Sequence, residues 1–431
     1  ENWVMISVRL LLLLAFSYAC VVLAIPHQFE NTKVIRTIEV TSAIAREDVG
    51  IRAKNIDSAP ASQYYFYVPA VIAESAASFN AFLRKEKTEL KVTFEQEDVA
   101  TKMYVYKIAL LEPVQPQQDV LIGLKVAYTH TVKPMPIKLP QVSRQHTVFA
   151  FNSYFLSPYQ TIETKTTLQT PTKNIISHTG AGGKSAATGN KVIYGPYENI
   201  SPLSFDIATC HFENSKPLLT ITKLERDVEI SHWGNNLAIE EHYALRNDGA
   251  KLEGDFNRVQ YQLTSQIHEQ TNVLKSLSFD LPVSARDPYY RDEVGNVSTS
   301  HFRVEKDKAV LEIMPRYPLF GGWNYTWYQG FNADLSSYVH KAKSGKYILN
   351  IKFVENVQDM TVDNAVIRIV LPEGATEHEL PIQIEYEYSG FRLLQKPIVA
   401  SMAIFVLFAV SICLNKMTFT ISNEKPSLKK E

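Results

Sequence analysis

Residues 120–132 read VLIGLKVAYTHTV, and an apolar side chain occupies every second position from Val120 to Tyr128. A period of two places these side chains on one face of a β-strand, because successive side chains of a strand point to opposite faces. Gly123, Lys125 and Ala127 stand at three of the four intervening positions, and Leu121 at the other. The run therefore predicts a long strand with one buried face.

Similar runs recur on both sides of this strand. We expect further strands at residues 92–96, 103–108, 347–354, 365–371 and 384–388. The 22 tyrosines and 21 phenylalanines agree with this expectation, since aromatic residues favour strands. One segment differs: residues 74–87 place Phe79, Phe82 and Leu83 among good helix formers, and we expect a helix there. The fold class predicted is mainly β with minor helix.

Breakers divide the chain into two parts. Residues 177–189 are small and polar and predict a flexible loop, and a new unit begins near residues 215–217. Short strand patterns that open each part resemble one another, through a repeated domain or through coincidence between short strand patterns. We therefore predict two tandem β-rich, sandwich-like domains at residues 25–215 and 216–396.

Two uncharged apolar segments lie near the ends of the chain. Residues 10–24 follow Arg9 and end in small residues, which predicts a secretory signal peptide over residues 1–24. Residues 397–414 are long enough to cross a bilayer and predict a transmembrane helix. The first segment could instead remain as an anchor, and the second could be a buried core helix.

The two segments together predict a single-pass type I membrane protein. The N-terminal part would be translocated, and residues 415–431 would form a short cytosolic tail whose four lysines fit the positive-inside bias. Cysteine usage points to an early secretory compartment, because Cys210 is the one cysteine between the two apolar segments and no intrachain disulfide can form there. Three N-x-S/T sequons are candidate glycosylation sites: Asn199, Asn296 and Asn324.

The composition and motifs exclude several classes of function. A net charge of −1 argues against a nucleic-acid partner, which requires a concentrated basic surface. H-E-x-x-H, C-x-x-C and G-x-S-x-G motifs are absent, and Gly180 to Ser185 only partly matches a phosphate-binding loop. Glu240 and Glu241 are adjacent, so in a strand they would point to opposite faces. We predict no catalytic residue, no cofactor and no metal site.

Residues 286–302 and 314–330 combine prolines, paired glycines and many aromatic residues. Tyrosine and tryptophan are favoured anchors of protein interfaces, and they are equally common in β-sheet cores. The candidate interface residues are Tyr289, Tyr290, Tyr317, Phe320, Trp323 and Trp327.

These two stretches contain the strings YYRDEVGNVSTSH (289–301) and PRYPLFGGW (315–323), and EISHWG (229–234), YFLSPY (154–159) and LPEG (371–374) occur elsewhere. In these strings the chain resembles the ribophorin I family, the alpha subunit of the endoplasmic reticulum oligosaccharyltransferase, in a short-tailed, fungal-like form. The resemblance covers nearly the whole chain.

The resemblance implies a non-catalytic subunit of the complex that transfers a preassembled oligosaccharide from dolichyl pyrophosphate to asparagine in N-x-S/T. It implies roles in assembly and substrate positioning, and residence in the endoplasmic reticulum membrane. The implied partners are the catalytic polytopic subunit, the other subunits, the membrane, and in addition the translocon and the nascent polypeptide. Two other classes of function stay open on the residues alone: a membrane-anchored lumenal hydrolase and a cell-surface adhesion module.

Overall fold

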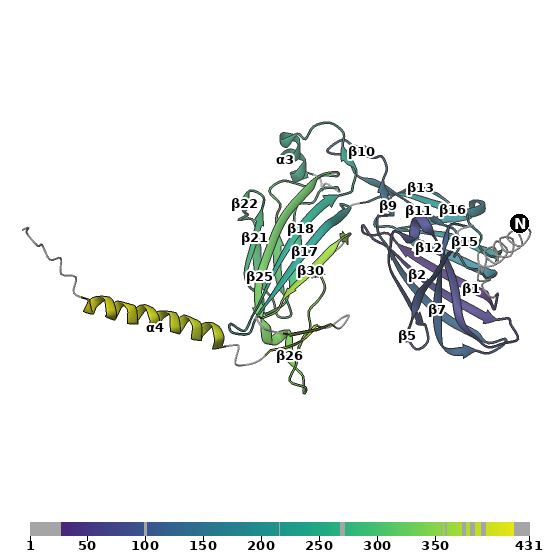
Figure 1. Cartoon of the computed structure of the whole chain (residues 1–431). Coiled ribbons are helices and arrows are strands. Elements are labelled where there is room, and N and C mark those ends of the chain that lie inside the picture. Colours follow the sequence, from purple (N-terminus) through teal and green to yellow (C-terminus); the bar gives the residue numbers. More distant parts are fainter. Residues whose placement is uncertain are drawn as a thin grey trace, which may run out of the picture.

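The computed structural model describes residues 27–98, 101–214, 216–267, 272–354, 356–357, 360–372, 376–379, 384–388 and 394–417. It contains two β-rich bodies that lie side by side, with a long helix projecting from the second (Figure 1). We call the described residues up to Leu218 the first half and those from Leu219 to Tyr388 the second half. The predicted signal segment and most of the predicted cytosolic tail lie outside the described residues.

An eight-stranded sheet forms the main layer of the first half. Its strands run in the order β14 (Ser185–Thr188), β15 (Lys191–Ile200), β12 (Thr161–Gln169), β1 (Phe29–Glu39), β2 (Ala45–Asn55), β8 (Asp119–Tyr128), β4 (Ala76–Leu83) and β5 (Glu89–Leu90). Strands β1 and β12 are parallel, and the other neighbours are antiparallel.

Two smaller sheets cover this layer. The first contains β3 (Ala61–Pro69), β7 (Met103–Val114) and β6 (Val92–Asp98). The second contains β13 (Ile175–Thr179), β16 (Ile207–Glu213), β11 (His146–Asn152) and β9 (Val132–Pro134). Each shares one cluster of buried hydrophobic side chains with the large sheet, so the layers are held together by apolar burial.

The strand predicted at residues 120–132 is β8, followed by β9. Ile122, Leu124 and Val126 are buried and Lys125 is exposed, as the period of two requires. Gly123 accommodates the Phe82 ring of the neighbouring strand, because a Cβ at this position would lie 2.4 Å from the ring. The hydrophobic pattern and one glycine together fix the register of β8 against β4.

The second half has a similar two-layer arrangement. Its larger sheet has the order β22 (Gly295–Asn296), β21 (Arg286–Asp292), β25 (Asn324–Asp334), β18 (Asn236–Asn247), β17 (Leu219–Ser231) and β29 (Met360–Val362), with β30 (Ala365–Val370) also paired to β17. The facing sheet contains β23 (His301–Val304), β24 (Ala309–Ile313), β20 (Leu277–Leu281) and β28 (Asn356–Val357).

The remaining elements of the second half are small. A further sheet contains β26 (Val339–Lys341), β27 (Tyr347–Leu349), β32 (Ile384–Glu387) and β31 (Thr376–Glu379), and helix α3 covers Arg258–Ile267. The short helix η2 covers Leu335–Ser337. One cluster of buried side chains, all from residues 219–386, forms the core. Because no core cluster combines residues from both halves, we propose that each half is a domain, with the division near the predicted residue 215.

Two predictions about local structure are wrong. Residues 74–87 are not a helix: the short helix α2 (Ala70–Ala73) is followed by strand β4, which pairs with β8 along its length. Sheet pairing outweighs the helix propensity of the alanines and of the longer side chains. Residues 177–189 are not a flexible loop, because they contain the end of β13, the turn η1 (Ala181–Gly183) and β14. Gly182 and Gly183 have positive φ and allow the chain to turn tightly from β13 in one sheet to β14 in another.

Helix α4 (Gln395–Lys416) contains the predicted span at residues 397–414. Its side chains are exposed and mostly apolar, and among the described residues it is the one helix long and apolar enough to cross a membrane. A helix that is apolar all round needs lipid or another apolar surface about it. The prediction of a mainly β fold with a C-terminal apolar helix is confirmed.

Candidate interaction surfaces

Three of the six predicted interface residues are buried within the second half. Tyr290, Phe320 and Trp327 are 3%, 0% and 3% exposed. The Trp327 ring stacks on Tyr243 at 4.8 Å, and Phe320 contacts Trp323 edge-on at 5.5 Å. These rings contribute to the core, where large aromatic side chains bury much apolar area. Trp323 is half-buried, and Tyr317 is 40% exposed with its hydroxyl donating to the Asn324 carbonyl.

The remaining candidate, Tyr289, belongs to a row of side chains on the outer face of the large sheet. His242 stacks on Tyr328 at 5.1 Å, and the Arg291 guanidinium lies 5.7 Å from the Tyr289 ring and 6.0 Å from the Tyr328 ring. The Tyr289 hydroxyl donates to Glu240. We call these five residues the outer-face row. Rings, a cation and a carboxylate alternate in it, which is the composition of a polar protein interface.

A glycine makes this arrangement possible. Gly330 is paired with Tyr289 on one side and Glu240 on the other. A Cβ on Gly330 would lie 2.3 Å from the Tyr289 ring, so the tyrosine lies across the glycine to reach the glutamate. Burial and the adjacent Glu240 carboxylate raise the pKa of Tyr289 above its usual value. The phenol is therefore a hydrogen-bond donor at neutral pH.

A shallow pocket of about 360 Å³ adjoins the row. Ala244 and Thr326 are among the small residues that line it, together with the His242 and Tyr328 rings and the Glu293 carboxylate. Thr326 donates a hydrogen bond of 2.5 Å to Glu293. The outer face therefore offers both hydrogen-bonding groups and ring edges to a partner.

The neighbouring carboxylates Glu240 and Glu241 point to opposite faces, as predicted. Glu241 is buried and accepts hydrogen bonds from Arg226 at 2.8 Å, Tyr243 at 2.9 Å and Gln329 at 3.1 Å. A buried charge surrounded by donors is a structural group of the core, because pairing offsets the cost of removing it from water.

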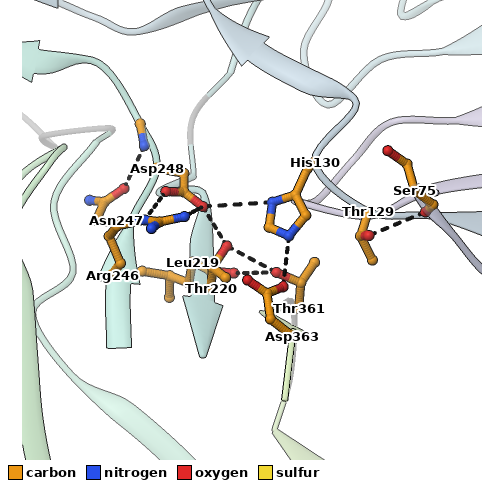
Figure 2. Close-up of polar contacts among 11 residues, drawn as sticks. Ser75, Thr129, His130, Leu219, Thr220, Arg246, Asn247, Asp248, Thr361 and Asp363 are labelled. Carbon is orange, nitrogen blue, oxygen red and sulfur yellow. Dashed lines mark hydrogen bonds and ion pairs between the residues drawn. The ribbon is translucent and has the colours of Figure 1, made fainter. Parts of the chain in front are cut away.

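The two halves meet at a polar junction that the sequence does not reveal. His130 follows β8, and its Nε2 lies 2.7 Å from Asp363 Oδ1 while its Nδ1 lies 3.8 Å from Asp248 Oδ2 (Figure 2). Asp248 also accepts from Thr220 at 2.5 Å and pairs with Arg246. A histidine of the first half is thus placed between two carboxylates of the second.

Main-chain contacts complete the junction. Strand β10 (Lys138–Leu139) of the first half pairs in parallel with β19 (Lys251–Leu252) of the second. The buried Gln145 accepts from the Ala250 amide at 2.8 Å and donates to the Lys216 carbonyl at 3.2 Å. A Cβ on Gly321 would lie 2.0 Å from the Ala250 carbonyl oxygen, so the glycine pair of the PLFGGW string allows close approach to this segment. The string thereby supports the strand that joins the halves.

The remaining predicted positions have simple environments. Asn199, Asn296 and Asn324 are exposed, so a glycan at any of them would meet solvent. Among the described residues, no group of three or more His, Cys, Asp and Glu side chains is placed to hold a metal ion. Cys210 is buried, and burial raises the pKa of its thiol to about 11, which leaves little thiolate at neutral pH.

The fold and surface define a class of protein: a large two-part β body with a polar, aromatic-rich outer face, which continues into an apolar C-terminal helix. A family model described as Ribophorin I matches residues 29–382. The chain belongs to the ribophorin I family.

Named relatives are similar in sequence to this chain over most of its length. A rice (Oryza sativa subsp. japonica) protein named dolichyl-diphosphooligosaccharide–protein glycosyltransferase subunit 1B is 31% identical over 90% of this chain and 91% of its own length. Subunit 1B of Arabidopsis thaliana is 30% identical over 88% and 90%. Subunit 1 of Caenorhabditis elegans is 29% identical over 92% and 74%. Among solved structures, native yeast LTA4 hydrolase is similar at a TM-score of 0.28 and 8% identity, over 43% of this chain and 29% of that one, which is too weak to support an inference.

Proposed function

We propose that this protein is a non-catalytic subunit of the oligosaccharyltransferase complex, which transfers a preassembled oligosaccharide from dolichyl pyrophosphate to asparagine in N-x-S/T. The observation that carries the proposal is the family match over residues 29–382, together with relatives named as subunit 1 of this transferase. The β body acts in assembly and substrate positioning, and the transfer reaction occurs on the catalytic polytopic subunit.

The proposed location is the endoplasmic reticulum membrane in type I orientation. Helix α4 is the anchor, and the β body lies in the lumen. Exposed sequon asparagines at positions 199, 296 and 324 support lumenal placement, because N-glycans are added there. Residues 415–431 then lie in the cytosol.

The outer-face row is the proposed contact with the lumenal part of another subunit, and the nascent polypeptide and translocon are further proposed neighbours. It presents Tyr289, Tyr328 and Arg291, residue types that dominate binding energy at protein interfaces. Its location on the solvent side of the sheet leaves the core undisturbed when it binds.

Depletion and rescue test the function. Cells depleted of the protein should show under-occupied sequons on secreted glycoproteins, and re-expression of the full chain should restore occupancy. To test for catalysis, the purified chain alone is given a lipid-linked oligosaccharide and an acceptor peptide, and no transfer should be detected. Normal occupancy after depletion, or transfer by the isolated chain, would contradict the proposal.

Substitutions in the outer-face row test the proposed contact with another subunit. The Tyr328→Ala, Arg291→Ala double variant should reduce co-purification of the other subunits several-fold, while leaving the thermal unfolding of the chain within a few degrees. Phe94→Ala is the matched control, because Phe94 is an exposed aromatic residue on β6 of the first half. Equal recovery of partners with both variants would remove the outer-face row from the interface.

A further inference from the structure

The turn between β17 and β18 exposes a tryptophan. Trp233 is 74% exposed, whereas Trp327 is 3% exposed and Trp323 is half-buried. Trp233 lies in the string EISHWG, one of the strings by which the sequence resembles its family, yet its side chain makes no contribution to the core. One exposed apolar side chain is ordinary on a protein surface, so the meaning of Trp233 depends on what lies beside it.

The turn lies beside the start of the apolar helix. A cavity of about 270 Å³ is lined by His232 and Trp233 of the turn, Tyr388 beyond β32, and Gln395 and Lys396 at the first turn of α4. Trp233 and the first turn of α4 therefore line the same cavity.

The position of the turn is fixed from its inner side. The His232 ring stacks on Tyr388 at 4.8 Å with an interplanar angle of 10°, and His232 Nε2 lies 2.8 Å from the hydroxyl of the buried Tyr386. Seven peptide steps separate Tyr388 from Gln395, which allows a span of at most about 25 Å. This short connection therefore keeps the turn near the N-terminal end of α4, where the span begins.

Neighbouring side chains add apolar surface to the same end of the body. Val370, which also lines the cavity, is 52% exposed, and Leu394, immediately before α4, is 51% exposed. Lys396 can extend its ammonium group to lipid phosphates while its stem follows the apolar surface. Tryptophan is enriched at the level of the lipid headgroups, where its ring is partly apolar and its indole N–H can meet water or phosphate.

We propose that the His232–Trp233 turn lies in the headgroup layer of the bilayer that α4 crosses, and forms a second membrane contact for the second half. One span leaves a tethered body free to rotate and tilt. A second contact on a rigid hairpin fixes the angle of the large sheet, and with it the height and direction of the outer-face row. The proposal depends on the span alone and not on the proposed function in glycosylation, so the two can fail separately.

The test uses the full chain with Trp3→Phe, reconstituted in phosphatidylcholine nanodiscs. Nanodiscs built from phospholipids that carry bromine on the acyl chain close to the headgroup should quench a large part of the tryptophan emission. Bromine quenches only a ring that it nearly touches, so quenching reports an indole at that depth. Trp233→Phe should remove most of the quenchable emission, whereas the matched variant Trp323→Phe should retain it. Far-UV circular dichroism verifies that both variants are folded.

A second measurement covers the assembled complex, purified in the same lipids. Continued quenching of Trp233 supports the lipid contact in the working assembly. If brominated lipid leaves the emission of Trp233 unchanged in the isolated chain, the first measurement overturns the proposal. Loss of quenching on assembly, with Trp233 shielded from a soluble quencher, would assign the turn to a partner subunit and would overturn it as well.

Discussion

Removing the buried carboxylate Glu241 should strongly destabilise the second half. Glu241 and Arg226 are 0% and 1% exposed and are joined at 2.8 Å, and Tyr243 and Gln329 also donate to the carboxylate. Glu241→Leu leaves the guanidinium buried without its main counter-charge. Breaking a buried pair from one side costs about 3–5 kcal/mol, and at roughly 2–4 °C per kcal/mol for a domain of this size the midpoint should fall by about 10 °C.

The structure supplies a local reporter for this measurement. Trp327 stacks on Tyr243, the residue that donates to Glu241, so its fluorescence follows the same core. Thermal and urea unfolding of the detergent-purified chain, followed by this emission in a Trp3→Phe, Trp233→Phe, Trp323→Phe background that leaves Trp327, gives the change in free energy. The double variant Arg226→Met, Glu241→Leu removes both charges and should recover most of the loss.

If Glu241→Leu lowers the free energy of unfolding by less than about 1 kcal/mol, this reasoning is refuted, because a change that small is typical of solvent-exposed ion pairs. The same conclusion would follow if the double variant were less stable than the single one. Either outcome would mean that the pair is hydrated, and that the layered packing of the second half is looser than described.

The remaining predictions concern the junction, the turn and one sequon. Substituting His130→Ala should cost at most about 1 kcal/mol, because the pair is half-exposed, yet should increase protease cleavage between the halves; unchanged cleavage would contradict its bridging role. Gly321→Ala should cost about 1–3 kcal/mol by displacing the strand that joins the halves, measured by urea unfolding, and an unaltered midpoint would contradict the close approach. Burial lowers the pKa of His232, so the turn should keep its stability above pH 6.5 and lose it as the pH falls through the folded-state value; the protection factors of amides at the turn, which correct hydrogen exchange for its intrinsic pH dependence, should fall between pH 7 and pH 5, whereas constant protection factors would contradict this. A variant that keeps Asn324 as its one sequon should show a single glycosidase-sensitive mobility shift, which Asn324→Gln in the same background should abolish; absence of the shift before that substitution would contradict lumenal glycosylation at Asn324.

Much of the fold could be predicted because alternation is a local signal. The strand at residues 120–132 was recognisable from its own side chains, and the apolar character of α4 needs no tertiary information. The helix prediction for residues 74–87 is wrong because pairing with β8 determines the conformation of that segment. The pairing partner lies about forty residues away in the sequence, so the local pattern does not reveal it.

The contact surfaces were less predictable for the same reason. The sequence alone does not distinguish buried from exposed aromatic residues in strings 289–301 and 315–323. In the structure, the two faces of β21 separate buried Tyr290 from Tyr289 on the outer face. His130 has no sequence signal at all, because its two carboxylate partners come from distant positions in the other half. Gly330 is a clue to the outer-face row, since a glycine inside a strand often marks a close approach.

Purification of the complex through this chain tests the central claim most directly. An affinity tag at the C-terminus of the full chain, with mild detergent and identification of the co-purifying polypeptides, should recover the catalytic polytopic subunit and the other oligosaccharyltransferase subunits in near-equal amounts. The recovered material should glycosylate an acceptor peptide. Recovery of the folded chain without any transferase subunit would contradict the account.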